Sequence, residues 1–340
     1  MNTSREKSKR NATSIDVARL AGVSQSTVSL VFGGKASGRV SPLTQKAVLR
    51  AAQELGYSPN TVARTLRLGH TNIVALIIPD VGNPFFASVL RGAEQAARKY
   101  NYTVVLVNTG NDQDWQRIVV EALATHSIEG FVLCSVSTSD TLELAKLKHR
   151  AVIVDRSSTE LTSLILDIGR GSQLAMQHLL SLGHRKIAHL ATNIDAETFE
   201  IRQQVYEATL HKAGISNRPD YTVQAAFIID EARIAASALL KLPDPPTAIF
   251  CDDALLAIGV YKAAKDYGLA IPQDLSVIGF SEGFLAKAID PELTAIAIPA
   301  AEIGARAIEM LVAGFQTNEN PQTETVSLEL VVRGSTAPPR

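Results

Sequence analysis

From residue 71 onward, short apolar runs alternate with longer amphipathic segments. Ile73–Ile78 is predicted to be a buried strand, followed by a helix over residues 85–100. Further strands are expected at residues 103–107, 130–134, 151–154, 187–190, 248–250 and 276–279, and further helices at 115–125, 142–148, 171–182, 198–212, 231–240 and 255–267. This alternation indicates parallel sheets covered by helices, and the number of strands predicts two subdomains. Such sheets bind ligands in a crevice at the carboxyl ends of their strands.

The formal net charge of −1 hides an asymmetry between the two parts of the chain. Residues 1–70 hold 11 Lys and Arg but 3 Asp and Glu, a charge of +8, whereas the other 270 residues hold 22 and 31, a charge of −9. The positive charge is spread over a segment patterned as helices. It therefore favours binding to nucleic-acid phosphates over a solvated basic tail.

Residues 13–32 predict two short helices joined by a tight turn. We expect Ser14 to cap the first helix, whose apolar face holds Val17, Ala18, Leu20 and Ala21. Gly22 falls where a sharp turn needs a positive φ, and Ser24 is placed to cap the second helix. This is the helix-turn-helix spacing. An ordinary helical hairpin would bury the same faces, but here the exposed side of the second helix carries side chains suited to base edges in the major groove, namely Gln25, Ser26 and Ser29.

A third helix is expected to begin at Pro42 with Ser41 as its N-cap and to end at Gly56. Its apolar face holds Val48, Ala51, Ala52 and Leu55. The segment that follows, residues 57–70, is long enough for about two turns of helix, which is too short to be stable in isolation.

The chemistry-bearing residues do not assemble into an enzyme motif. Residues 279–283 match the G-x-S-x-G elbow of serine hydrolases, but no histidine follows Ser281, so the required chain order is impossible. No complete dinucleotide or Walker loop is present, and His178 and His184 lack partners at metal-binding spacing. Two cysteines, Cys134 and Cys251, exclude a disulfide scaffold. We therefore expect no enzymatic activity, no cofactor and no metal.

Membrane and secretory segments are also not expected. No apolar stretch approaches the roughly 18–20 residues that a membrane helix needs. The basic N-terminus has no apolar segment after it, so it does not resemble a secretory signal. We expect a soluble, cytoplasmic protein.

The segment from Ser14 to Leu66 resembles the LacI/GalR family of bacterial transcriptional regulators. The matching motifs are DVARLAGVS at residues 16–24, TVS at 27–29, VSPLT at 40–44, GYSPN at 56–60 and ARTL at 63–66. The resemblance implies that the second helix reads DNA through Ser24, Gln25, Ser26, Thr27, Ser29 and Leu30. It also implies a hinge helix in the minor groove that carries Asn60, Ala63 and Leu66, with Leu66 wedged into the central base step.

Two residues of the second helix depart from the family pattern. The family often has Arg where Leu30 stands and Asn where Gly33 stands. A leucine cannot donate to guanine, although it can touch a thymine methyl group. The operator sequence therefore stays open, whereas the expected binding mode, with the second helix in the major groove, is unaffected.

The resemblance continues through residues 79–86, 155–156, 178–184, 271–280 and 291–294, which are similar to the family's effector domain. That domain has the periplasmic-binding-protein fold, with a ligand cleft between two lobes. The resemblance implies a cleft where Asp155 accepts hydrogen bonds, Arg202 clamps the ligand and Phe227 closes the site. The full set is Phe85, Phe86, Asp155, Arg202, Phe227, Asp252 and Ser281, although Phe85 and Phe86 also fit an ordinary core at a helix start.

Several departures fall in or near this cleft. The family usually has Asn where Asp252 stands and Asp where Ser281 stands, and Ile168 and Val205 replace a usual Asn and Gly. The loss of a charged acceptor at position 281 weakens the case for an ordinary sugar. The effector is therefore expected to be unusual or absent.

Together these features predict an all-α helix-turn-helix N-terminal domain and an α/β two-lobed periplasmic-binding-protein-like domain with two parallel sheets. The expected divisions are a basic tail (1–12), the helix-turn-helix domain (13–57), a hinge (58–69) and an effector-binding and dimerisation domain (70–340). We expect a homodimeric repressor that binds double-stranded DNA at a pseudo-palindromic operator and responds to a small-molecule effector. The alternative is a sugar-binding receptor without regulatory DNA binding, against which the helix-turn-helix argues.

Overall fold

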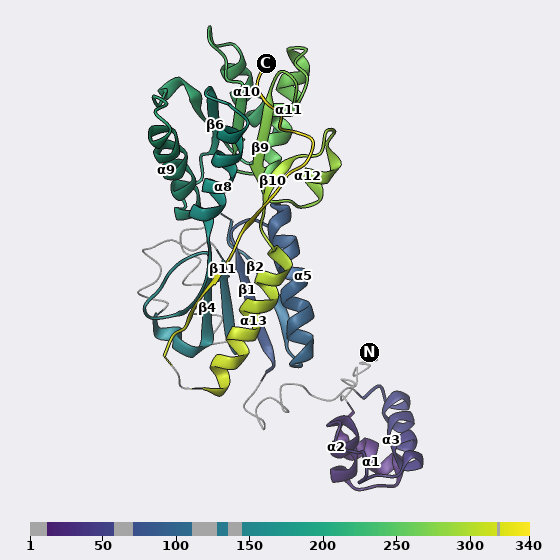
Figure 1. Ribbon diagram of the computed structural model, residues 1–340. Coiled ribbons are helices and arrows are strands. Elements are labelled where there is room, and N and C mark those ends of the chain that lie inside the picture. Colours follow the sequence, from purple (N-terminus) through teal and green to yellow (C-terminus); the bar gives the residue numbers. More distant parts are fainter. Residues whose placement is uncertain (1–11, 58–70, 111–127, 135–144, 318–319) are drawn as a thin grey trace, which may run out of the picture. The chain divides into compact units, whose positions relative to one another are not determined.

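The computed structural model describes residues 12–57, 71–110, 128–134, 145–317 and 320–340. The chain divides between Thr71 and Asn72 into two compact units, drawn in Figure 1. The helix expected at 115–125 and the hinge residues Asn60, Ala63 and Leu66 lie outside the described residues.

The first unit contains three helices: α1 (Ser14–Ala21), α2 (Gln25–Phe32) and α3 (Pro42–Glu54). Gly22 ends α1 in the left-handed region at φ 66°, which only glycine adopts without strain. The N-caps Ser24 and Ser41 each accept a hydrogen bond from a backbone amide in the first turn, as predicted. The core is small and consists of Val17, Ala18, Val28, Val48, Ala51 and Ala52.

Three details of the first unit differ from the sequence-based expectation. Thr13, not Ser14, caps α1, and it forms a capping box with Asp16, because Thr13 is extended while Ser14 already belongs to the helix. Leu20 is 48% exposed and Leu55 is 37% exposed. Neither belongs to the core cluster, because three short helices bury only a small apolar core.

The second unit contains two six-stranded sheets among its described residues. The first sheet, in the order β11-β5-β4-β3-β1-β2, is parallel and consists of β1 (Ile73–Ile78), β2 (Thr103–Asn108), β3 (Gly130–Cys134), β4 (Ala151–Val154), β5 (Thr162–Leu166) and β11 (Thr323–Val326). The second, in the order β12-β10-β9-β8-β6-β7, is parallel except at β12 and consists of β6 (Ile187–Thr192), β7 (Thr222–Ala225), β8 (Ala248–Cys251), β9 (Ser276–Phe280), β10 (Thr294–Ala297) and β12 (Glu329–Val331).

Each sheet is the centre of one lobe. The first lobe carries α5 (Pro84–Lys99), the 3₁₀ helix η2 (Ala145–Arg150) and α13 (Ala300–Gln316). The second lobe carries α8 (Ile168–Ser181), α9 (Glu197–Lys212), η3 (Pro219–Tyr221), α10 (Ile229–Leu240), α11 (Ala254–Asp266) and α12 (Phe284–Ala288). The chain passes between the lobes at residues 166–168, 297–300 and 326–329. The predicted two-lobed fold is thus confirmed.

Helix α13 was not among the predicted elements, and the helix expected at 142–148 is 3₁₀ over its described part. In Figure 1, α13 runs beside α5 on the first lobe although more than 200 residues separate them in sequence. The two helices meet at glycines. A Cβ at Gly92 would lie 1.8 Å from the carbonyl oxygen of Ala301, and a Cβ at Gly304 would lie 2.0 Å from that of Val89. Only glycine permits so close an approach of two backbones.

Candidate functional site

The face of α2 expected to read DNA is polar and accessible. Ser24, Gln25 and Ser26 are exposed, whereas Thr27, Ser29 and Leu30 are half-buried. The Ser24 hydroxyl lies 2.7 Å from that of Ser26 and 2.9 Å from that of Thr27. The helix carries no charged residue, so any phosphate-neutralising charge near it comes from other segments, such as the exposed Lys35 and Arg39 that follow α2.

A cavity of about 520 Å³ lies between the two lobes of the second unit. The first lobe contributes the start of α5, including Phe85, and the start of α13, while the second lobe contributes Asp253, Ser281 and most of α12. Phe85 and Ser281 are the two members of the expected effector set that line this cavity. Phe86 is only 6% exposed and packs in the core, edge-on to Phe85.

Arg202 is buried in the second lobe, with its side chain held among aromatic rings. Its guanidinium carbon lies 3.9 Å from the centre of the Phe280 ring and 4.8 Å from that of Phe199. One terminal nitrogen, Nη1, donates to the backbone oxygen of Asp252, and Nη2 lies 3.4 Å from the hydroxyl of Thr198. Among the described residues its Nε has no hydrogen-bond partner, so this buried guanidinium keeps one donor unused.

Asp252 is fully buried and its carboxylate is already engaged. Oδ1 lies 2.9 Å from His189 Nε2, and Oδ2 accepts a hydrogen bond of 2.9 Å from the backbone amide of Thr192. Burial by itself would raise the pKa of Asp252, but His189, Arg202 and the Thr192 amide together hold it below its ordinary value. The carboxylate therefore stays ionised and ties β8 to β6.

Asp155 lies at the end of β4 in the first lobe and has a positive φ of 65°. Burial raises the pKa of Asp155 to about 6, against the lowering effects of Arg202 and of a hydrogen bond with Thr198. The next residue, Arg156, lies 3.5 Å from Glu197 at the start of α9. Both interactions join the first lobe to the second, so the cleft is bridged by charged and polar side chains at this edge.

The remaining expected residue, Phe227, is half-buried, and its ring centre lies 6.0 Å from that of Phe199. Sequence reasoning missed Phe199, Thr198 and Glu197, which all lie in the first turns of α9. A usable signal was present, because Phe199 and Thr198 precede Arg202 by three and four residues and so share its helix face. Asp253 was also missed. Its carboxylate caps α11, and burial raises its pKa to about 6.

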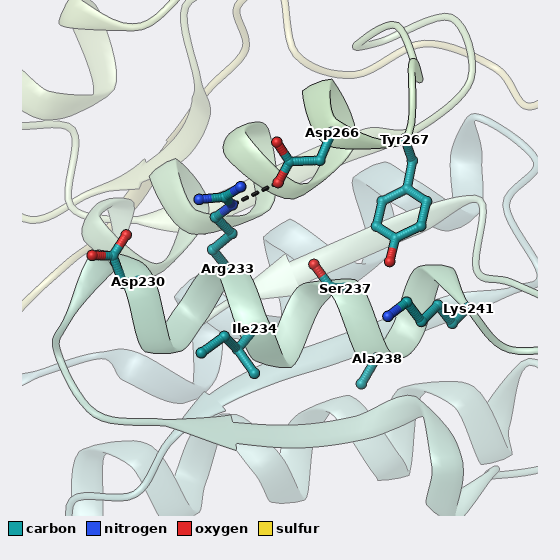
Figure 2. A pocket seen from close by; sticks show the side chains of 8 residues that line it. All are labelled: Asp230, Arg233, Ile234, Ser237, Ala238, Lys241, Asp266 and Tyr267. Carbon is teal, nitrogen blue, oxygen red and sulfur yellow. Dashed lines mark hydrogen bonds and ion pairs between the residues drawn. The ribbon is translucent and has the colours of Figure 1, made fainter.

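A larger open hollow of about 970 Å³ lies along α10 and the end of α11 in the second lobe (Figure 2) and is called the outer hollow below. It is lined by one face of α10 and its C-cap and by the end of α11, namely Asp230, Arg233, Ile234, Ser237, Ala238, Lys241, Asp266 and Tyr267. Arg233 donates a hydrogen bond of 2.6 Å to Asp266. None of the expected effector residues lines this hollow. Its size therefore does not make it the effector site.

The cysteines and histidines considered above hold structural positions. Both cysteines are buried, and burial raises the pKa of Cys134 to about 12, which disfavours a reactive thiolate. His178 lies 2.9 Å from the Thr336 hydroxyl, and His184 lies 2.9 Å from the Ala337 carbonyl oxygen, so both rings bond to the C-terminal segment. Within the described ranges, no three His, Cys, Asp or Glu side chains gather as a metal site. Nor does any helix in those ranges have the length and apolar character needed to cross a membrane.

The first unit is a three-helix DNA-binding head with a helix-turn-helix, and the second unit has two parallel-sheet lobes around a cleft. This combination defines a class of DNA-binding regulators that respond to a ligand. Two family models match the chain. The model "Bacterial regulatory proteins, lacI family" matches residues 15–60, and the model "Periplasmic binding protein-like domain" matches residues 176–336.

Whole-chain relatives agree with these matches. The ribose operon repressor of Haemophilus influenzae is 35% identical, covering 95% of this chain and 98% of that protein. The transcriptional regulator CelR in complex with cellobiose is 27% identical with a TM-score of 0.71, covering 95% of this chain and 99% of the other. The lac repressor dimer bound to operator and the anti-inducer ONPF has the same fold, with a TM-score of 0.85 at 23% identity over 96% of this chain and 100% of the other. This chain belongs to the LacI family of DNA-binding transcriptional regulators.

Proposed function

We propose that this protein is a homodimeric repressor that acts in the cytoplasm on a pseudo-palindromic operator. Residues 13–57 form its DNA-binding domain behind a basic tail at 1–12, residues 58–69 form the hinge, and residues 70–340 form the domain that binds effector and dimerises. Two identical heads suit a palindrome, because each reads one half-site. Residues 1–70 hold 11 basic and 3 acidic residues, and this positive charge supports a DNA-binding role for the N-terminal part of the chain.

The DNA-contacting residues in this proposal are Ser24, Gln25, Ser26, Thr27, Ser29 and Leu30 of the first unit, joined by Asn60, Ala63 and Leu66 of the hinge. Of the first six, Ser24 caps α2 and the others lie within it, with Gln25, Ser26 and Thr27 in its first turn, where a recognition helix meets base edges. Their side chains are short or neutral, which supports readout by hydrogen bonds and methyl contacts.

The effector in this proposal is a sugar or another small metabolite bound between the lobes. The candidate contacts are Phe85, Phe86, Asp155, Arg202, Phe227, Asp252 and Ser281. The geometry divides them by availability. Phe86 is already packed in the core and the carboxylate of Asp252 is already hydrogen-bonded, so these two residues would hold neighbouring side chains in place and would not contact the ligand directly. The relative solved with cellobiose and the structure from Enterococcus faecium solved with ribose support a sugar as ligand class.

One observation carries the proposal that the ligand controls the lobes. Charged side chains join the lobes beside the ends of β4 and α9: Arg156 of the first lobe lies 3.5 Å from Glu197 of the second, and the half-buried Asp155 and the buried Arg202 each alter the pKa of the other. A ligand that competes for either charge changes the free energy of lobe closure. Because closure moves the segments that lead to the two heads, a ligand with different affinities for the two arrangements changes the affinity for DNA.

The test uses the full-length protein with a metabolite panel screened by thermal shift, since a ligand that binds the folded state raises its melting temperature. A hit is then titrated into an operator gel shift. We expect Arg202→Met to lose both responses and to keep operator binding without ligand. Arg233→Met, in the outer hollow, is the matched control and should behave as the wild type. An effector response that persists in Arg202→Met would refute the assignment of the cleft.

A further inference from the structure

The first residues of α1 and α2 are joined by a side-chain hydrogen bond. The carboxamide nitrogen of Gln25, Nε2, donates to the hydroxyl oxygen of Ser14 over 3.0 Å. Gln25 is exposed and opens the helix proposed to enter the major groove, while Ser14 opens the preceding helix. The bond therefore fixes a side chain of the reading face from a second helix.

The neighbouring hydroxyls in the same turn are already paired with one another. Ser24 accepts from the backbone amide of Thr27 and lies within hydrogen-bond distance of the hydroxyls of both Ser26 and Thr27. Among the exposed residues at the start of α2, Gln25 lies outside this cluster of hydroxyls, and its carboxamide carries donor and acceptor on two separate atoms.

The bond leaves a specific pair of groups free on Gln25. Nε2 carries two hydrogens, and one of them is given to Ser14, which leaves one donor hydrogen and the acceptor Oε1. Adenine is the base whose major-groove edge offers one donor, the N6 amino group, beside one acceptor, N7, which matches an acceptor and a donor on Gln25. If the amide were turned the other way, Oε1 would accept from the Ser14 hydroxyl and both hydrogens of Nε2 would be free, an arrangement that suits the two acceptors of guanine.

We infer that Ser14 is a positioning residue that holds Gln25 in the orientation that reads an adenine in each operator half-site. The inference rests on the proposed contact between Gln25 and the bases. A glutamine has several rotatable bonds, and binding normally costs the freedom of such a side chain; an orientation fixed before binding lowers that cost. The role of Ser14 is separable from helix stability, because Thr13 and not Ser14 caps α1.

The experiment begins with the operator. Full-length wild-type protein selects its site from a random duplex library, and each conserved A·T pair of the selected half-site is then changed symmetrically to G·C. Affinity is measured by fluorescence anisotropy at one fixed salt concentration for wild type, Ser14→Ala, Ser14→Thr, Gln25→Ala and the double variant Ser14→Ala/Gln25→Ala.

We expect one A·T pair at which Gln25→Ala removes the discrimination against G·C. At that pair Ser14→Ala should lower the discrimination by about 2- to 10-fold, the range expected for one hydrogen bond, and Ser14→Thr should restore it. The double variant should match Gln25→Ala, because Ser14 acts through Gln25.

Three results would overturn the inference: unchanged discrimination in Ser14→Ala, effects of the two substitutions that add in the double variant, or a Gln25-dependent pair that is G·C. A wild-type protein that selects no site would instead contradict the proposed function. Thermal melts of all variants should coincide with the wild type, which separates a change in reading from a loss of folded head.

Discussion

Substituting Gly304 by alanine tests whether the contact between α5 and α13 positions the cleft. The new Cβ would lie 2.0 Å from the backbone oxygen of Val89 and 2.8 Å from its carbonyl carbon. Both obstacles are backbone atoms, so no side-chain rotation relieves them, and the helices must separate by about 1 Å or more. We expect a loss of about 1–3 kcal/mol in the free energy of unfolding, the usual cost of overpacking a core.

The same substitution should alter the ligand response. The starts of α5 and α13 both line the cavity between the lobes, α5 through Pro84, Phe85 and Ser88 and α13 through Ala300, Ala301 and Glu302. A separation of the two helices changes the shape of that wall. The affinity for an effector should therefore fall at temperatures where the variant is still fully folded.

Gly169→Ala is the matched control for this prediction. Gly169 also lies in a helix, but a Cβ there meets only the side chain of Ile201 at 3.9 Å, an ordinary contact. Alanine should be neutral or should stabilise the helix by about 0.5–1 kcal/mol. Urea denaturation followed by circular dichroism measures both variants. Equal midpoints for Gly304→Ala and Gly169→Ala would refute the argument that close backbone contact requires Gly304.

Two other substitutions give distinct outcomes. Ser24→Ala removes the hydroxyl that accepts from the Thr27 amide, so the head should lose about 1 kcal/mol of stability and bind operator more weakly, as thermal melts and anisotropy would show. Asp155→Asn tests the raised pKa of Asp155: since the folded-state pKa is about 6, above the ordinary value, the carboxyl's contribution to stability is full at low pH and is lost as the pH rises through about 6. The stability of the variant should lack that loss, so the difference between variant and wild type measured by urea denaturation should change between about pH 4 and pH 6 and level off above that range; a difference that stays constant from pH 4 to pH 6 would contradict the assignment.

The sequence by itself determined the local elements and the class of each unit. The turn at Gly22, the caps at Ser24 and Ser41, and the strands at Ile73–Ile78 and Gly130–Cys134 depend on residues within a few positions of one another. These elements can be predicted without knowledge of the fold, because φ restrictions, capping and hydrophobic periodicity act over single turns or strands. For the same reason, the helix-turn-helix motif of the first unit could be predicted from the sequence alone.

Tertiary structure alone decided which of the expected cleft residues are available and which are occupied. The carboxylate of Asp252 is hydrogen-bonded to His189, 63 residues away in sequence, and Phe86 belongs to the core. Helix α13 packs against α5 on the first lobe, where Gly304 allows the two backbones to approach closely. Neither segment by itself predicts this contact. Burial, charge pairing and close packing depend on segments distant in sequence, and these contacts form only when the sheets have brought those segments together.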